Sequence, residues 1–188
     1  MDFTITHKEK LILIKTARLV IENHLFHKKQ DLPETTETLK QDCGAFVTLH
    51  KKGSLRGCIG YVMAVKSLIN TIKDVAVSAA FRDPRFPPLS ADEYSEIDLE
   101  ISVISPFEPV SSIEDIQVGK HGLMIRKAGY SGLLLPQVAT EYGWDRETFL
   151  THTCYKAGLS GDEWKSKDTS IEMFTAIVFG ELEMGLLG

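Results

Sequence analysis

The sequence predicts an α+β protein: a compact, two-lobed domain with a mostly antiparallel sheet flanked by helices. Helical and strand-like periodicities alternate along the 188 residues, and hairpin-like turns join several of the strand-like segments. With 43% hydrophobic and 25% charged residues, the chain can bury a substantial core. We therefore expect one domain over residues 1–188, with a division into two unequal lobes as an option.

The N-terminal part predicts a long helix followed by an irregular connection. Thr6 and Glu9 have the spacing of a capping box, in which each side chain accepts a hydrogen bond from the other residue's backbone N–H. Apolar residues recur at helical intervals from Leu11 to Leu25, so the helix is expected to end near Lys28. The next stretch, DLPETTETLKQDC, is polar and contains proline, which indicates an irregular segment.

A hairpin and a second helix are predicted next. GAFVTLH (residues 44–50) and LRGCIGY (residues 55–61) are rich in β-forming residues, and the turn-like KKGS separates them. Apolar residues return to helical spacing between Lys66 and Phe81. Pro84 prevents a simple continuation of that helix, so RDPRFPPLS is expected to be a loop.

The remaining segments complete the mixed pattern. IDLEISVIS (residues 97–105) alternates apolar and polar residues, as a strand with one buried face does. GLMIRK and GLLLP flank AGYS and predict a second hairpin. Helices are expected to begin near Pro136 and Asp145, and IEMFTAIVFGELEM is a terminal β-rich stretch.

Charge and composition limit the classes of function. The formal net charge of -5 and the isoelectric point near 5.7 give no overall attraction to nucleic acid or to an anionic membrane. The N-terminus lacks the pattern of a secretory signal, and no segment is apolar for long enough to span a bilayer. The sequence therefore predicts a cytoplasmic protein without a membrane partner and disfavours nucleic acid as a partner.

The cysteines and histidines indicate no metal site. Cys43, Cys58 and Cys154 are widely spaced, which predicts free thiols rather than a disulfide framework or a zinc site. His24 and His27 lie three apart on the first predicted helix but lack a third partner in sequence. No metal is expected, and the sequence leaves any cofactor unidentified.

The stretch SLRGCIGY concentrates unusual chemistry on one predicted strand. Strand alternation places Arg56, Cys58 and Gly60 together on one face. Gly57 and Gly60 would let a ligand or another backbone approach closely. A guanidinium beside a thiol favours the thiolate, the form in which cysteine acts as a nucleophile.

Each of these residues also has a purely structural interpretation. Free cysteine is a common small core residue, and Arg56 would then pair with a carboxylate such as Asp83, Asp98 or Glu100. His121, between two glycines in VGKHGLMI, is the best candidate for a general base. An exposed turn histidine is an equally good interpretation of this position.

Several common catalytic motifs are missing from the sequence. There is no Gly-x-x-x-x-Gly-Lys-Ser/Thr loop, no Gly-x-Gly-x-x-Gly turn after a strand, and no Gly-x-Ser-x-Gly elbow. The usual nucleotide-hydrolase, dinucleotide-binding and serine-hydrolase interpretations therefore lose their support.

The motifs as an ordered set resemble a known family. GAFVTLHKKGSLRGCIGY, DPRFPPLS, IDLEISVIS, GKHGLMI and LLLPQVATEYGWDRETFLTHTCYKAGL occur in this order. Together they resemble the AMMECR-one domain family, also called AmmeMemoRadiSam system protein A. The resemblance implies two unequal α+β lobes, a cleft lined by the LRGCIG strand, and a pathway shared with Memo-type and radical S-adenosylmethionine proteins.

The resemblance also nominates site residues, without assigning roles to them. Arg56 and Arg85 could bind a carboxylate or phosphate, held in place by Asp83 or Glu100. The candidate site residues are Arg56, Gly57, Cys58, Gly60, Asp83, Arg85, Phe86, Glu100, Ser102, His121 and Gln137.

Three functions stay open on the sequence. The preferred one is a binding module for a small anionic ligand or a partner peptide, because the sequence places no base or oxyanion-stabilising group beside Cys58. The second is a thiol-dependent enzyme in which Cys58 is the nucleophile and His121 the base. The third is a nucleotide or nucleic-acid binding module, which the acidic chain disfavours.

Overall fold

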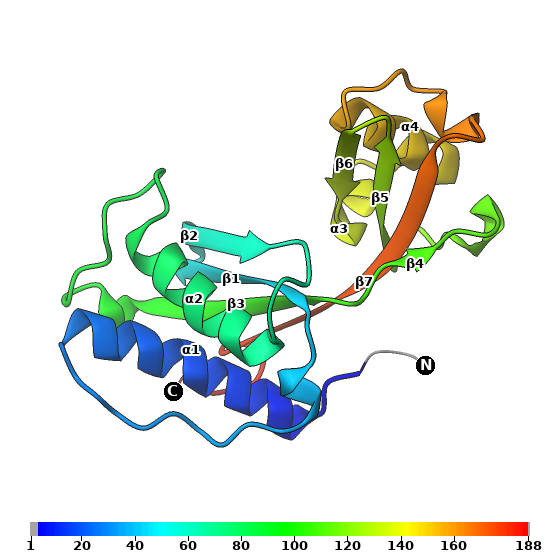
Figure 1. The fold of residues 1–188 in the computed structure, drawn as a ribbon. Helices are drawn as coiled ribbons and strands as arrows, with labels where there is room; N and C mark the ends of the chain where they lie inside the picture. Colours follow the sequence, from blue (N-terminus) through cyan, green and yellow to red (C-terminus); the bar gives the residue numbers. More distant parts are fainter. Residues whose placement is uncertain (1–3, 188) are drawn as a thin grey trace. The chain divides into compact units, whose positions relative to one another are not determined.

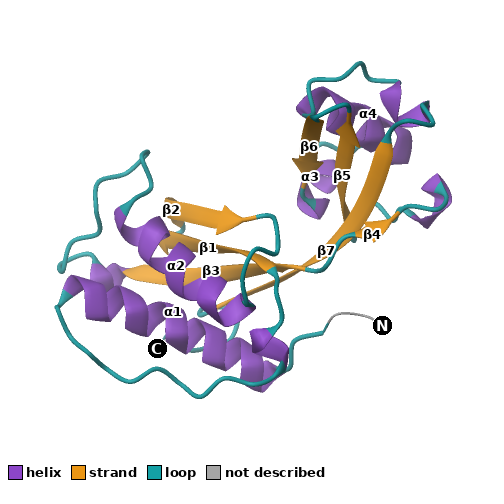
Figure 2. Ribbon diagram, viewed as in Figure 1, coloured by secondary structure: helices purple, strands orange, loops and turns teal. Residues whose placement is uncertain are grey.

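A computed structural model describes residues 4–187 of the chain. The chain divides into two compact units. Unit 1 comprises the chain up to residue 104 together with the segment from 177 onward, and unit 2 comprises residues 105–176. The α+β class with antiparallel strands and flanking helices is confirmed in both units (Figures 1 and 2).

Unit 1 consists of a three-stranded antiparallel arrangement and two long helices. The strands lie in the order β2-β1-β3, so β1 is central and β2 is an edge. The end of β7, from residue 177 onward, continues beside β3. The elements are α1 (His7–Leu25), β1 (Gly44–Lys51), β2 (Ser54–Tyr61), α2 (Leu68–Phe81) and β3 (Ile97–Ile104).

Alternation along the strands decides which face of this sheet is buried. Ala45, Val47 and Leu49 of β1 are fully buried, and they belong to one core with apolar residues of α1 and α2. The two helices therefore cover the same face of the sheet (Figure 1). The intervening residues of the strands point to the opposite face, which we call the outer face.

The β1–β2 hairpin carries a bulge that shifts the alternation of β2. Its turn uses Lys52 and Gly53, both with positive φ (53° and 76°), as a two-residue hairpin with the native twist requires. The pairing then passes directly from His50 opposite Leu55 to Leu49 opposite Gly57. Arg56 is consequently an extra residue without a partner on β1.

Unit 2 has its own antiparallel strands and its own core. β7 lies between β4 and β5, and β6 pairs with β5. α3 packs against β5, and α4 packs against β5 and β6. The elements are β4 (Glu108–Pro109), β5 (His121–Lys127), β6 (Tyr130–Leu134), α3 (Pro136–Glu141), α4 (Arg146–Lys156) and β7 (Ser170–Gly180), whose last residues belong to unit 1.

The boundaries differ from the predicted ones in a few places. α1 ends at Leu25 instead of near Lys28, and His27 has a positive φ of 52° that no helix continues through. The second hairpin turns at Ala128 and Gly129 instead of over AGYS. β4 was not predicted, because a two-residue strand carries no periodicity.

The helices give no indication of a membrane span. Between residues 4 and 187, no helix combines the length and the apolar composition needed to cross a bilayer.

Candidate functional site

The outer face of unit 1 brings together several of the predicted site residues. Cys58 and Gly60 lie on it from β2, and Glu100 and Ser102 lie on it from β3. These positions are half-buried, in contrast to the fully buried residues on the helix-covered face. The β1 residues between them, Phe46, Thr48 and His50, were not predicted as site residues.

A row of three functional groups crosses the three strands at the centre of the outer face. Thr48 pairs with Cys58 on one side and with Glu100 on the other. The Thr48 hydroxyl donates a hydrogen bond to the Cys58 Sγ at 3.2 Å. The row therefore presents a thiol, a hydroxyl and a carboxylate side by side, at the roughly 5 Å spacing of directly paired residues.

Neither glycine of LRGCIGY leaves open space for a ligand. A Cβ added at Gly60 would lie 2.3 Å from the Phe46 ring, so the ring already occupies the space above this glycine. A Cβ added at Gly57 would lie 2.2 Å from the carbonyl oxygen of Ala79 in α2. Close approach was expected at both glycines, and it is made by the protein itself: the Phe46 ring at Gly60 and the α2 backbone at Gly57.

Asp83 and Arg85 bind the free edge of β2 at Cys58. The buried Asp83 carboxylate accepts a hydrogen bond from the Cys58 backbone N–H at 2.9 Å, and Arg85 Nη2 donates to the Cys58 carbonyl oxygen at 3.2 Å. Arg85 also donates to Asp83 through Nε (3.0 Å) and Nη2 (2.7 Å). These bonds from Arg85, together with the Cys58 N–H, hold the pKa of Asp83 well below its usual range. The pair thus satisfies the strand edge beside the thiol.

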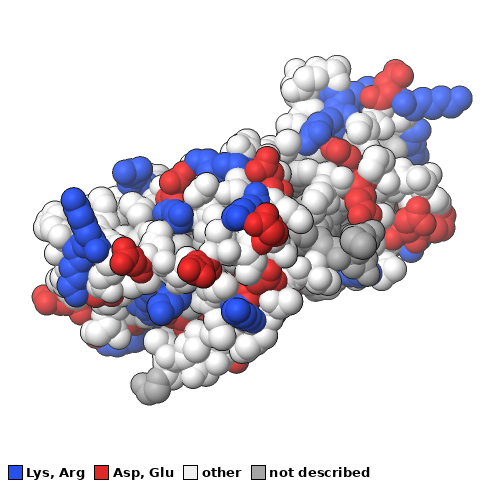
Figure 3. Space-filling model, turned by 60° about the horizontal axis from the view of Figure 1, so that its bottom comes forward, with Lys and Arg blue, Asp and Glu red and all other residues white. Residues whose placement is uncertain are grey.

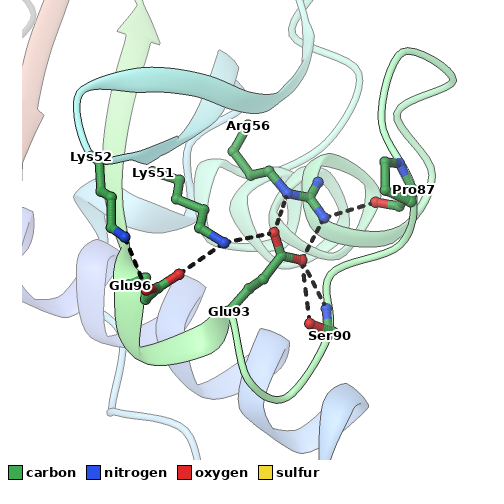
Figure 4. Close-up of polar contacts among 7 residues, drawn as sticks. All are labelled: Lys51, Lys52, Arg56, Pro87, Ser90, Glu93 and Glu96. Atoms are coloured by element: carbon green, nitrogen blue, oxygen red, sulfur yellow. Dashed lines mark hydrogen bonds and ion pairs between the residues drawn. The ribbon is translucent and has the colours of Figure 1, made fainter.

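Arg56 points away from Cys58, contrary to the prediction. The bulge places it on the side of Lys51, and its guanidinium is held by Glu93, with Nε at 3.1 Å and Nη2 at 2.9 Å from the two carboxylate oxygens (Figure 4). Arg56 Nη2 also donates to the Pro87 carbonyl oxygen, and Lys51 Nζ lies 3.2 Å from Glu93. Its partner is therefore none of Asp83, Asp98 and Glu100.

Phe86 connects the two guanidinium groups on this side. Its ring centroid lies 5.9 Å from the Arg56 guanidinium carbon and 5.6 Å from that of Arg85. Both distances are those of cation–π contacts. Phe86 thus packs the loop after α2 onto the β2 edge and does not lie on the outer face.

Glu93 gives the site a pH-dependent contribution to stability. Hydrogen bonds from Arg56 and Ser90 lower the pKa of Glu93 from 4.5 to about 2. The contribution of Glu93 to the free energy of unfolding is complete above pH 4.5, and it is lost as the pH falls toward the folded-state pKa of about 2. We expect Glu93→Gln to lower the free energy of unfolding by about 1–3 kcal/mol near neutral pH. In urea titrations, the difference from the unmodified protein should shrink between pH 4.5 and about 2; a constant difference would contradict this role.

A pocket adjoins the row on the β3 side. His50 Nδ1 lies 3.4 Å from Asp98 Oδ2, across the same pair of strands. The pocket has a volume of about 310 Å³, and its lining includes His50, Asp98, Glu100 and, from the C-terminal segment, Glu183. This volume lies at the small end of the range for ligand pockets. Its carboxylates make the β3 side of the outer face acidic.

The comparisons with known proteins decide the family. The AMMECR1 family profile matches residues 14–179. The chain belongs to the AMMECR1 family. A protein of Methanothermobacter thermautotrophicus is 47% identical to it over 188 residues, which cover 94% of this chain and 96% of the relative.

A further relative is similar in sequence, and a solved structure is similar in both sequence and fold. A protein of Methanocaldococcus jannaschii is 41% identical over 187 residues, which cover 95% of this chain and 93% of the relative. The crystal structure of an uncharacterized protein from Pyrococcus horikoshii matches with a TM-score of 0.72 at 40% sequence identity, over 89% of each chain. The family resemblance predicted from the ordered motifs is therefore confirmed.

Two predicted site residues of this AMMECR1-family protein belong to unit 2. His121 is 8% exposed, and its Nδ1 accepts a hydrogen bond from the Gln117 backbone N–H at 3.2 Å. Burial, and to a lesser degree the charge of Lys120, lowers the pKa of His121, which favours the neutral imidazole. Gln137 lies exposed in the first turn of α3. Neither residue belongs to the outer face of unit 1.

The three cysteines differ sharply in their accessibility. Cys58 is half-buried, whereas Cys43 and Cys154 are 1% and 0% exposed. Burial raises the pKa of Cys43 to about 11 and also raises that of Cys154. We expect iodoacetamide to alkylate Cys58 at least about tenfold faster than the other two in the native protein. Peptide mass spectrometry measures this; equal rates in the native state, compared with a urea-unfolded control, would contradict the placement of Cys58.

Proposed function

We propose that this AMMECR1-family protein is a binding module whose ligand docks on the outer face of unit 1. The observation that carries the proposal is the half-buried row of Cys58, Thr48 and Glu100, which borders the pocket at Glu100. Polar groups lined up on an accessible sheet face, next to a concave surface, are typical of a recognition site. If Cys58 served only for packing, its thiol would be expected inside the core, where Cys43 lies.

A partner peptide fits this face better than a small anion. Arg56 is 7% exposed and paired with Glu93, and Arg85 is paired with Asp83. In each guanidinium group, the Nε and Nη2 donors already bind a carboxylate of unit 1. Asp98, Glu100 and Glu183 add negative charge at the pocket, so a ligand with N–H donors or a positive group is favoured.

The partner is proposed to act in a pathway shared with Memo-type and radical S-adenosylmethionine proteins. This part of the proposal rests on membership of the AMMECR1 family and on the association that the family resemblance implies. Nucleic acid is disfavoured as the ligand. The net charge is -5, and Lys and Arg side chains are interspersed with Asp and Glu on the face drawn in Figure 3.

A peptide-display selection tests the binding role. Peptides enriched on the unmodified protein should bind Thr48→Val and Glu100→Gln variants about 5- to 150-fold more weakly, because each change removes a polar contact worth about 1–3 kcal/mol. Thr35→Val and Glu37→Gln are matched controls, since both residues are exposed in unit 1 and lie outside the three strands. Enriched peptides that bind the site variants and the controls equally would contradict the proposal.

A thiol-dependent enzyme is the second candidate. The Thr48 hydroxyl donates a hydrogen bond to Sγ, and His50 with Asp98 supplies an imidazole and a carboxylate on the same face. On this alternative, alkylation of Cys58 would be faster than that of an unstructured thiol at neutral pH, and His50→Asn would slow it. The binding module predicts an ordinary rate for the accessible thiol and no effect of His50→Asn.

A further inference from the structure

Unit 2 carries a stack of aromatic side chains at its surface. The rings of Tyr142 and Trp144 are stacked, with centroids 5.0 Å apart and planes at 17°. Trp144 and His152 are stacked at 3.9 Å and 9°, and Tyr155 meets His152 edge-on at 5.6 Å. We call these four residues the aromatic ladder. It joins the segment after α3 to one side of α4.

The two ends of the aromatic ladder are largely exposed to solvent. Tyr142 is 69% exposed and Tyr155 is 57% exposed, whereas Trp144 packs partly against the core of unit 2. Among the residues described, Trp144 is the only aromatic contact of Tyr142. The outer face of the Tyr142 ring is therefore available, and exposed aromatic surface of this kind commonly marks an interaction site.

The charged residues that lie within five positions of Tyr142 in the sequence are mostly acidic. Glu141 and Glu147 are exposed, and neither forms a salt bridge with any residue of the described chain. Asp145 is exposed as well and caps α4 through a hydrogen bond from the Thr148 N–H. The one cation in this segment, Arg146, donates through Nε to the Ile116 carbonyl oxygen at 3.0 Å. An aromatic face next to unpaired carboxylates attracts a cation.

We propose that the Tyr142 end of the aromatic ladder binds an arginine side chain of a partner peptide. A planar guanidinium can stack on the free ring face and extend the ladder by one layer, while its N–H donors reach the neighbouring Glu141 carboxylate. Lysine lacks the planar group that stacks, and a phosphate backbone is repelled by the carboxylates. This surface belongs to unit 2 alone and does not depend on the binding role of the outer face.

The test uses the fluorescence of Trp144, which stacks directly on Tyr142. The chain has 2 tryptophans, so Trp164→Phe leaves Trp144 as the only one. The probe is an acetylated and amidated Gly-Arg-Gly peptide, with its lysine and citrulline counterparts as comparisons. We expect a saturable change in Trp144 fluorescence with the arginine peptide, a weaker one with lysine, and none with the uncharged citrulline.

Variants locate the binding on the ladder. Tyr142→Ala should weaken binding of the arginine peptide by about 2- to 30-fold, the range of a cation–π contact. Glu141→Gln should weaken it by about two- to fivefold, as expected for an exposed ion pair. Tyr130→Ala is the matched control, because Tyr130 is 58% exposed in unit 2 and has no part in the ladder. Melting curves check that each variant is folded.

Several results would overturn the proposal. They are the absence of a saturable signal, equal binding of the citrulline peptide, and unchanged affinity in a folded Tyr142→Ala variant. A single-stranded oligonucleotide that saturates the same signal more tightly than the arginine peptide would assign the surface to nucleic acid instead. None of these outcomes bears on the outer face of unit 1, which peptide selection tests separately.

Discussion

Gly57→Ala is expected to destabilise the protein by at least about 3 kcal/mol, because the new methyl group meets a helix backbone that cannot move aside. The added Cβ would lie 2.2 Å from the Ala79 carbonyl oxygen and 3.2 Å from its carbonyl carbon. No side-chain rotation relieves this contact. β2 would have to separate from α2, which together bury a large part of the core of unit 1.

Urea unfolding followed by circular dichroism measures the effect. The matched control is Ser54→Ala, at the exposed start of the same strand, which should change the unfolding free energy by less than about 0.5 kcal/mol. A Gly57→Ala protein as stable as this control would show that β2 and α2 are farther apart than the structure places them.

Asp83→Asn is expected to destabilise the protein by about 2–4 kcal/mol. The Asp83 side chain is 2% exposed and accepts hydrogen bonds from Arg85 and from the Cys58 backbone. An amide removes the charge that Arg85 pairs with, and its NH₂ group cannot accept the hydrogen bonds from Arg85 or the Cys58 N–H that one carboxylate oxygen accepts in Asp83. Because the bond to Cys58 fixes β2 beside the thiol, the substitution should also increase the alkylation rate of Cys58.

Asp74 offers the control for this substitution. It pairs with Lys66 on the surface, where its side chain is 50% exposed. Asp74→Asn should therefore cost no more than about 1 kcal/mol. If the two asparagine variants unfold at the same urea concentration and label Cys58 at the same rate, Asp83 does not anchor β2.

Most of the fold could be predicted from hydrophobic periodicity. IDLEISVIS alternates cleanly and forms β3 at Ile97–Ile104, and the capping box of Thr6 and Glu9 begins α1. These signals are local, because each segment's own pattern records which face is buried. The bulge at Arg56 depends on the pairing with β1, so strand alternation alone placed Arg56 on the wrong face.

Only those features of the site that follow from strand alternation within one segment could be predicted from the sequence. Alternation in GAFVTLH places Phe46 and Thr48 on the same face of β1. Regular pairing onward from His50 opposite Leu55 would place Thr48 opposite Gly57, and only the bulge brings it opposite Cys58. Glu93 is different: it lies 37 residues from Arg56, and no spacing rule connects the two. The role of Gly60 also required the partner strand, because Phe46 lies opposite it and covers it.

Protection of Cys58 by a bound peptide is the most direct measurement of the central claim, that the ligand docks on the row of Cys58, Thr48 and Glu100. The native protein is treated with iodoacetamide with and without a saturating peptide from the display selection, and alkylation is followed by mass spectrometry. We predict that the peptide slows alkylation of Cys58 at least about tenfold, because a docked chain covers the thiol. An unchanged rate at full occupancy would contradict the claim and place the peptide on another surface.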